Sequence, residues 1–194
     1  MSRGLNIVRI ISGQWKGRNL KTVKGMDTRP TSAKVKGAIF NILAGKVMSA
    51  RVLDLFAGTG NLSFEALSRG ARHAVLVEKD TSALETIRKN AEILGAFPRT
   101  SILRMDAMNF FKQAAQESFD LIFLDPPYRR GLADMALAYL QTHPILNPGG
   151  VIIIETSTEE TIDDAIDPLE IRLTREYGDT RLWFIQNKEE HEEG

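Results

Sequence analysis

The chain has 194 residues, of which 43% are hydrophobic and 26% are charged, so it is long enough for one globular domain with a full core. It contains no cysteine, which excludes disulfides, iron–sulfur clusters, thiolate metal sites and every mechanism that needs a cysteine nucleophile. The longest apolar runs, such as residues 151–154, are far shorter than the roughly 20 residues that span a bilayer. Since the start shows no signal-peptide pattern, we expect a soluble, cytoplasmic protein.

Charge is distributed unevenly, although the formal net charge is zero. Residues 1–50 contain ten Lys and Arg against one acidic residue, Asp27, so they carry +9 and the remainder carries −9. A basic segment on an acidic body favours a polyanionic partner, because neutralising phosphates releases counterions. The alternative interpretation is a basic N-terminus that is merely solvated.

The first expected elements, in chain order, are two strands over residues 7–11 and 18–23, joined through Gly13 and Gly17 as a basic hairpin. Thr31 is then predicted to cap a helix that runs to about residue 43, because the apolar residues that follow have helical spacing.

From residue 51 onward, short apolar runs alternate with helical patterns. The runs lack polar alternation, which suits parallel strands buried on both faces, and they lie at 51–56, 74–78, 101–104, 120–124 and 150–155. The helical patterns lie near 61–69, 80–94, 107–116 and 131–141. Two further strands, 169–176 and 181–186, are expected to close the sheet as an antiparallel hairpin. The pattern predicts a Rossmann-like, doubly wound α/β fold with a mostly parallel seven-stranded sheet.

The first parallel strand leads into a glycine loop with an acidic residue on either side. Gly58 and Gly60 stand at the strand-to-helix turn, where glycine lets the backbone pass close to a ligand. A dinucleotide fingerprint needs a third glycine where this chain has Ser63. Asp54 lies at the end of the strand, and Glu78 closes the next strand 20 residues after Gly58.

Three carboxylates at successive strand ends favour S-adenosylmethionine over NAD. Glu78 is placed to accept hydrogen bonds from ribose hydroxyls. Asp54 would repel a pyrophosphate but suits a cationic amino-acid tail. Asp106, after the third strand, is placed to accept from the adenine amino group. The structural alternative is that Asp54 caps its turn, Glu78 is a solvated strand end and Asp106 caps the following helix.

The fourth parallel strand ends in the tetrapeptide Asp125-Pro126-Pro127-Tyr128. Consecutive prolines remove two donors and hold the preceding residues extended, so the local carbonyls and the Asp125 carboxylate are free to accept hydrogen bonds. Tyr128 supplies a flat face for a base. This combination suits an exocyclic amine on a planar ring, whereas the alternative is a plain rigid turn.

These motifs and the N-terminal segment resemble the bacterial 16S ribosomal RNA guanine-N2 methyltransferase family, within the class I S-adenosylmethionine-dependent methyltransferases. The resemblance covers roughly residues 8–187, and its matching segments are Arg-Ile-Ile-Ser-Gly-Gln-Trp-Lys-Gly-Arg (9–18), Thr-Arg-Pro-Thr (28–31), Asp-Leu-Phe-Ala-Gly-Thr-Gly (54–60), Phe-Glu-Ala-Leu-Ser-Arg-Gly (64–70) and Asp-Pro-Pro-Tyr (125–128). Ser12 departs from the pattern, since a glycine is common there, and the acidic tail lies outside it.

The resemblance implies methyl transfer from S-adenosylmethionine to the N2 amine of a guanine in 16S rRNA, with S-adenosylhomocysteine as the second product. The expected catalytic residues are Asp125, Pro126, Pro127 and Tyr128. The expected cofactor-binding residues are Asp54, Phe56, Gly58, Gly60, Glu78, Lys79, Asp106 and Ala107. The basic segment and the Arg-Pro-Thr loop are expected to contact the substrate RNA through Arg9, Lys16, Arg18, Lys21, Arg29 and Thr31.

Three parts are expected along the chain: a basic hairpin arm and loop (1–30), the methyltransferase domain (31–187) and an acidic disordered tail (188–194). We expect a monomer that acts on an assembling small ribosomal subunit by direct in-line transfer, without a metal, a covalent intermediate or a membrane. A metal centre is not indicated, because the three histidines are scattered.

Three other functions use some of the same features. A DNA adenine-N6 methyltransferase has a similar tetrapeptide, but it also needs a separate element to read duplex DNA, for which this chain has no insertion. A small-molecule methyltransferase would not need the basic segment. A non-catalytic RNA-binding module would leave the carboxylate series and the tetrapeptide unexplained.

Overall fold

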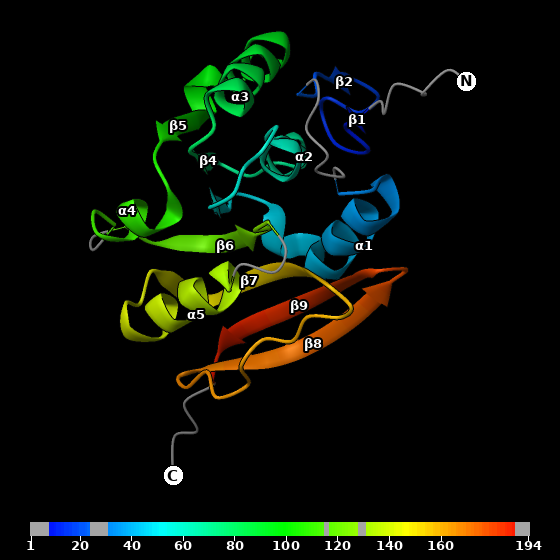
Figure 1. Cartoon of the computed structure of the whole chain (residues 1–194). Coiled ribbons are helices and arrows are strands. Elements are labelled where there is room, and N and C mark those ends of the chain that lie inside the picture. Colours follow the sequence, from blue (N-terminus) through cyan, green and yellow to red (C-terminus); the bar gives the residue numbers. More distant parts are fainter. Residues whose placement is uncertain (1–7, 24–30, 115–116, 128–130, 189–194) are drawn as a thin grey trace.

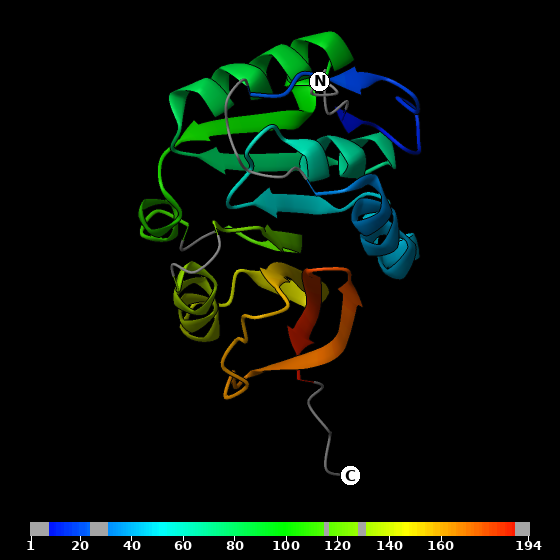
Figure 2. The same cartoon turned by 45° about the vertical axis from the view of Figure 1, so that its right-hand side comes forward.

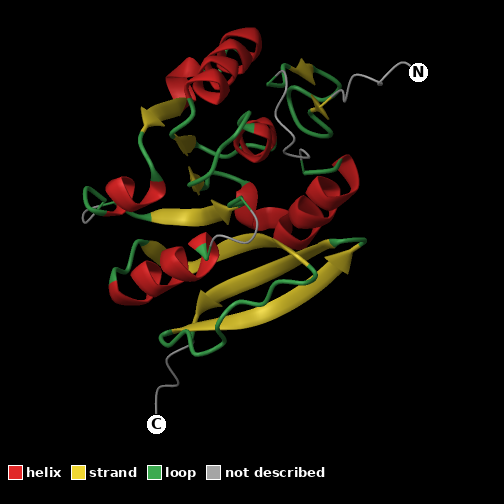
Figure 3. Ribbon diagram, in the orientation of Figure 1, coloured by secondary structure: helices red, strands yellow, loops and turns green. Residues whose placement is uncertain are grey.

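The computed structural model describes residues 8–23, 31–114, 117–127 and 131–188. Within these residues a seven-stranded sheet carries helices on both faces (Figures 1 and 3). Its strands are β3 (Arg51–Asp54), β4 (His73–Glu78), β5 (Thr100–Arg104), β6 (Phe119–Leu124), β7 (Leu146–Ser157), β8 (Leu169–Tyr177) and β9 (Thr180–Asn187). The helices are α1 (Ala33–Leu43), α2 (Asn61–Ser68), α3 (Thr81–Leu94), α4 (Ala107–Phe111) and α5 (Leu132–Thr142), with 3-10 turns η1 (Ala44–Val47) and η2 (Phe97–Arg99).

The strand order is β5-β4-β3-β6-β7-β9-β8. Strands β3 to β7 are mutually parallel, whereas β9 runs antiparallel between β7 and β8. The predicted Rossmann-like sheet with a terminal antiparallel hairpin is therefore confirmed. Of the described helices, none is long and apolar enough to cross a membrane.

The sheet separates two hydrophobic cores, because successive side chains on each strand point to opposite faces. In β3, Val52 packs into the core under α1, α2 and α3, and its neighbour Leu53 packs into the core under α4 and α5. In β6, Leu121 and Ile122 divide in the same way. Both faces are buried, which explains why these strands show no polar alternation in the sequence.

The N-terminal hairpin is shorter than predicted. It consists of β1 (Val8–Arg9) and β2 (Asn19–Leu20), not of strands over 7–11 and 18–23. The reason lies in the hydrogen bonds just beyond β1, where the backbone N–H groups of Ile11 and Ser12 donate to the Glu65 carboxylate on α2 at 2.8 and 3.0 Å. A side chain of α2 thus takes the place of a partner strand.

Glu65 and Lys36 form a buried ion pair beneath this hairpin, with Nζ and Oε2 3.1 Å apart and both side chains at most 1% exposed. The Lys36 ammonium also donates to the Arg9 carbonyl and to Asn61 Oδ1, each at 2.7 Å. Burial lowers the pKa of Lys36, and the charge of Glu65 opposes this shift. The pair joins α1 and α2 to the N-terminal segment.

Gly13 lies where the hairpin crosses the end of α2. Its φ is +79°, and a Cβ atom there would lie 1.9 Å from the Ser68 carbonyl oxygen. The approach is close because the Gln14 N–H donates to that carbonyl at 2.8 Å. Glycine is therefore required for both conformation and space.

Other elements also differ from their predicted lengths, and β3 ends at Asp54 rather than at residue 56. Helix α4 ends at Phe111 rather than near residue 116, because the N–H groups of Gln113 and Ala114 bond to carbonyls three residues back and tighten the turn. Strand β7 begins at Leu146, four residues earlier than predicted, and an irregularity in its pairing with β6 accommodates the glycines at 149 and 150.

Candidate active site

The carboxyl ends of the parallel strands meet along one edge of the sheet, as the arrowheads of β3, β4 and β5 show in Figure 2. Asp54 and Glu78 are the last residues of β3 and β4. Asp125 follows β6 directly, and the pairing of Leu124 with Ile154 brings it beside Glu155 of β7. Four carboxylates from four strands therefore lie along one edge.

Glu78 fixes the glycine loop between β3 and α2. Its Oε2 accepts the Gly58 N–H at 2.9 Å, and its Oε1 accepts the N–H groups of Lys79 and Asp80, each at 2.8 Å. Glu78 is half-buried, and the Lys79 side chain is exposed. The carboxylate is held by backbone donors rather than being a loosely solvated strand end.

Gly60 is the N-cap residue of α2 and has a φ of +76°. A Cβ atom there would lie 2.5 Å from the Phe64 ring, so the tight entry into the helix requires glycine. Before the turn, the half-buried Phe56 packs against the core under α4 and α5.

Asp54 is 2% exposed and accepts a hydrogen bond from the Ser63 hydroxyl at 2.7 Å. Burial, and to a smaller extent the nearby charges of Asp125 and Glu78, raise the pKa of this carboxyl to about 7 against the opposing hydrogen bond from Ser63. Ser63, the residue that breaks the dinucleotide fingerprint, is thus the hydrogen-bond donor to the buried acid.

This raised pKa predicts a pH-dependent stability. The folded protein binds a proton at Asp54 that the unfolded chain releases near pH 4, so Asp54 should destabilise the fold progressively as the pH rises toward 7. Replacing Asp54 with Asn should remove this effect. In urea unfolding, the difference in unfolding free energy, variant minus wild type, should increase by up to about 4 kcal/mol between pH 4 and pH 7. If the unfolding free energies of the variant and the wild type differed by the same amount at every pH, the raised pKa of Asp54 would be contradicted.

Asp106 is the N-cap of α4, where its Oδ1 accepts the Asn109 N–H at 2.9 Å and its Oδ2 accepts the Asn109 side-chain amide at 2.7 Å. The next residue, Ala107, is the first of the helix and is buried. Asp106 therefore caps α4, as the structural alternative predicted. Its carboxylate is also exposed, at the end of the loop after β5.

Thr31 is not the cap of α1. Ser32 holds that position, and its hydroxyl accepts the Val35 N–H at 3.2 Å. The Thr31 side chain turns inward instead, because its hydroxyl donates to Glu155 Oε2 at 3.1 Å and lies 3.4 Å from Asp125 Oδ2. Thr31 is 8% exposed, so its hydroxyl belongs to the carboxylate cluster.

Glu155 was missed by the sequence interpretation, although it ends the fifth apolar run just as Asp54 and Glu78 end earlier ones. It is 6% exposed, and its burial raises its pKa to about 7. Burial and the charge of Glu155 together raise the pKa of Asp125 well above its usual range.

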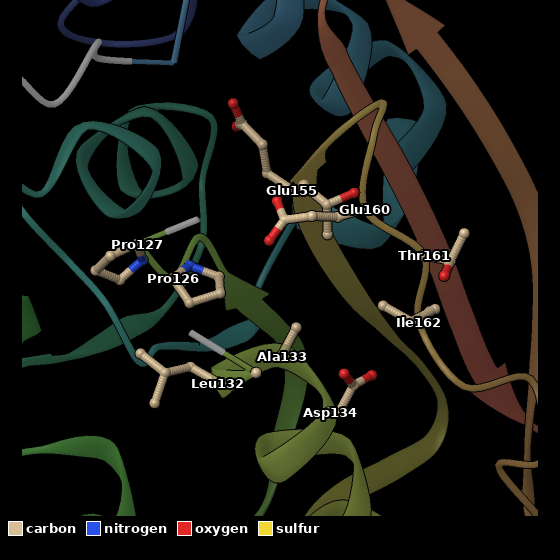
Figure 4. A pocket seen from close by; sticks show the side chains of 11 residues that line it. Pro126, Pro127, Leu132, Ala133, Asp134, Glu155, Glu160, Thr161 and Ile162 are labelled. Carbon is tan, nitrogen blue, oxygen red and sulfur yellow. The ribbon is translucent and has the colours of Figure 1, made fainter. Parts of the chain in front are cut away.

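A cavity of about 220 Å³ adjoins this cluster (Figure 4). Pro126 and Pro127 form one side of it, and Glu155 and Glu160 lie on the other side. The first turn of α5 and the segment after β7 complete the wall. The tetrapeptide thus borders a cavity lined by several hydrogen-bond acceptors, while Tyr128 and Arg29 lie outside the described residues.

Four of the basic residues assigned to RNA lie in the hairpin segment (residues 8–23), far from the cavity-lining residues in the sequence. Exposed side chains there are those of Arg9, Lys16, Arg18 and Lys21. Arg18 donates to the Ile93 carbonyl on α3 at 2.9 Å, and the Lys21 N–H donates to Asn90 at 2.7 Å. The segment therefore lies beside α3, as Figure 1 shows.

The family described as Conserved hypothetical protein 95 matches residues 8–186. A Bacillus subtilis relative named "Putative rRNA methyltransferase YlbH" is 38% identical over 183 residues, which cover 93% of this chain and 100% of the relative. An Escherichia coli relative named "Ribosomal RNA small subunit methyltransferase D" is 36% identical over 156 residues, which cover 80% of this chain and 78% of the relative.

A solved Escherichia coli structure named "Putative methyltransferase yhhF" has the same fold, with a TM-score of 0.84 at 32% identity over 94% of this chain and 98% of that one. The family match spans residues 8–186, and the Bacillus subtilis relative and the solved structure are each matched over more than nine tenths of this chain. The chain belongs to the Conserved hypothetical protein 95 family of methyltransferases, together with relatives that bear the name ribosomal RNA small subunit methyltransferase D.

Proposed function

We propose that this protein transfers a methyl group from S-adenosylmethionine to the exocyclic N2 amine of a guanine in 16S rRNA. The observation that carries the proposal is the group of acceptors around Asp125, which adjoin a cavity beside Pro126. An exocyclic amine offers two N–H donors to such acceptors. The name of the Escherichia coli relative supports small-subunit rRNA as the molecule that carries the amine.

Asp125 and the prolines would hold the amine. The N2 lone pair of guanine is delocalised into the ring, so the nitrogen is a poor nucleophile. The Asp125 carboxylate and the Pro126 carbonyl would accept hydrogen bonds from its two N–H groups and favour a more pyramidal nitrogen. The guanine must leave its stack to enter the cavity, and Tyr128 would provide a face against which it stacks.

The glycine loop fits a cationic methyl donor. Asp54 and Glu78 repel one another at the sheet edge, so a positively charged ligand beside them would relieve that repulsion. Gly58 and Gly60 keep the adjoining backbone free of side chains. These residues, with Asp106, would hold S-adenosylmethionine, which supplies an electrophilic methyl group when bound.

The test is methyl transfer from labelled S-adenosylmethionine to 16S rRNA and to genomic DNA in parallel, followed by nucleoside analysis. We expect the label in N2-methylguanosine from the rRNA. Label in N6-methyladenine from the DNA, or in another nucleoside, would overturn the assignment.

Replacing Glu78 with Ala should weaken S-adenosylmethionine binding by about 1–3 kcal/mol, because both the proposed ribose contact and the anchor of the Gly58 N–H are lost. Isothermal titration calorimetry measures this change. Glu85→Ala, an exposed carboxylate on α3, is the matched control and should bind normally. Unchanged affinity in a folded Glu78→Ala protein would rule out this role for Glu78.

If the hairpin segment binds RNA, replacing Lys16, Arg18 and Lys21 together with Ala should weaken RNA affinity and leave cofactor affinity unchanged. Each phosphate contact that is lost should reduce the slope of log affinity against log salt by about 0.7–0.9. Filter binding across a salt series measures the slope.

The matched control for this experiment replaces three exposed basic residues on another part of the surface, Lys112, Arg172 and Arg175. The control should keep the wild-type slope. If the hairpin variant also keeps it, the charges of the segment are only solvated, and another surface binds the RNA.

A further inference from the structure

Two carboxylates share one hydroxyl behind the tetrapeptide. The Thr31 Oγ1 lies 3.1 Å from Glu155 Oε2 and 3.4 Å from Asp125 Oδ2. A hydroxyl has one hydrogen, so it can donate to only one ionised carboxylate at a time. Both contacts are satisfied as hydrogen bonds only when one carboxyl is protonated and donates to the Thr31 oxygen. The geometry therefore suits an Asp125–Glu155 pair in which one carboxyl is protonated and the other is ionised.

We propose that Glu155 is a positioning residue for this reaction: beside the Thr31 hydroxyl that both carboxylates share, its negative charge prepares Asp125 to accept the proton that the target amine releases. This inference rests on the proposed function. The amine lone pair forms the new N–C bond, the C–S bond breaks with its electrons remaining on sulfur, and the extra N–H proton passes to the Asp125 carboxylate. Glu155 does not touch the amine in this scheme.

The position of Thr31 is itself fixed. The Asn61 side-chain amide donates to the Thr31 carbonyl at 3.4 Å, and the oxygen of the same amide accepts from Lys36. Thr31 is thus tied to the buried ion pair beneath the hairpin, and it reaches residues 94 and 124 positions further along the chain.

The charged groups that face the pair are all acidic among the described contacts. Asp54 of β3 faces Asp125, and Asp179 of the β8–β9 turn faces Glu155. These charges disfavour ionisation, and the Thr31 hydrogen bond opposes them. Asp125 is therefore a stronger base than an exposed carboxylate, and Glu155 contributes to that strength through its charge.

Two variants should shift the titration of Asp125 in opposite directions. Glu155→Gln removes a negative charge, so the pKa of Asp125 should fall. Thr31→Val removes a hydrogen bond that favours the ionised carboxylate, so the pKa of Asp125 should rise. Glu159→Gln makes the same change at an exposed position four residues after Glu155, and it should leave Asp125 unaffected.

The direct measurement is a ¹³C carboxyl NMR titration of the ligand-free protein and these variants. The signal of Asp125 is assigned by its loss in Asp125→Asn. The acidic limb of the pH profile of kcat for methyl transfer should move in the same directions as the pKa of Asp125. It should shift to lower pH in Glu155→Gln and to higher pH in Thr31→Val. We expect kcat at pH 8 to fall about tenfold or more in Glu155→Gln, with KM for RNA within about twofold.

An Asp125 titration that is the same in the wild type and both variants would overturn the inference, as would variants that lower kcat without moving the acidic limb. The NMR titration needs neither cofactor nor RNA. A wild-type protein that fails to methylate guanine would therefore contradict the proposed function, while the titrations would still decide whether Glu155 and Thr31 control Asp125.

Discussion

Replacing Asp125 with Ala is expected to reduce methyl transfer to 16S rRNA by at least about 100-fold, since the variant loses both the acceptor that orients the amine and the base that takes its proton. The affinity for S-adenosylmethionine should stay within about threefold, because the proposed role of Asp125 is on the amine. Single-turnover transfer and calorimetry measure the two quantities separately.

Asp164→Ala, an exposed carboxylate in the segment after β7, is the control and should retain normal transfer. Asp125→Asn keeps one oxygen acceptor but removes the base, so it should also be severely impaired. If Asp125→Asn retained most of the wild-type rate, orientation alone would explain the role of this residue, and the proton would have to leave by another route.

Glu65→Ala is expected to destabilise the fold by about 3–5 kcal/mol, as is typical when one partner of a buried ion pair is removed. The Glu65 carboxylate accepts from the backbone N–H groups of Ile11 and Ser12, from Arg69 and from Lys36. Its loss leaves the buried Lys36 ammonium without its counter-ion and the two half-buried backbone donors without their acceptor.

Urea unfolding measures this change, with Glu92→Ala on the exposed face of α3 as the control, which should alter stability by less than about 0.5 kcal/mol. Glu65→Gln should also be destabilising, because its NH₂ group would face a backbone donor. A loss below about 1 kcal/mol in Glu65→Ala would show that the hairpin segment is held mainly by its apolar side chains, such as Ile10 and Trp15.

The sheet could be predicted from the sequence because its strands are buried on both faces and form continuous apolar runs. The acids that end these runs could be predicted for the same reason, since the ends of parallel strands meet at one edge. Asp54, Glu78 and Asp125 all lie there. Glu155 ends a run of the same kind and could have been found by applying this rule to all five strands.

Other features could not be predicted, because they depend on contacts between distant parts of the chain. Thr31 and Ser32 are both acceptable N-cap residues by type. The choice between them is made by Glu155 and Asp125, which bind the Thr31 hydroxyl from far along the sequence. The short hairpin has a similar cause, since Glu65 takes N–H groups that a longer strand pairing would have used.

The strand order also determines when the sheet can be completed during synthesis. Strand β8 pairs only with β9 among the described strands, and β9 lies between β7 and β8. As the chain leaves the ribosome, β8 is therefore made while the edge of β7 that β9 will occupy is still unpaired. Its alternating charges, at Glu170, Arg172 and Glu176, make it a poor partner for that apolar edge. The sheet can therefore be completed only after β9 has been made.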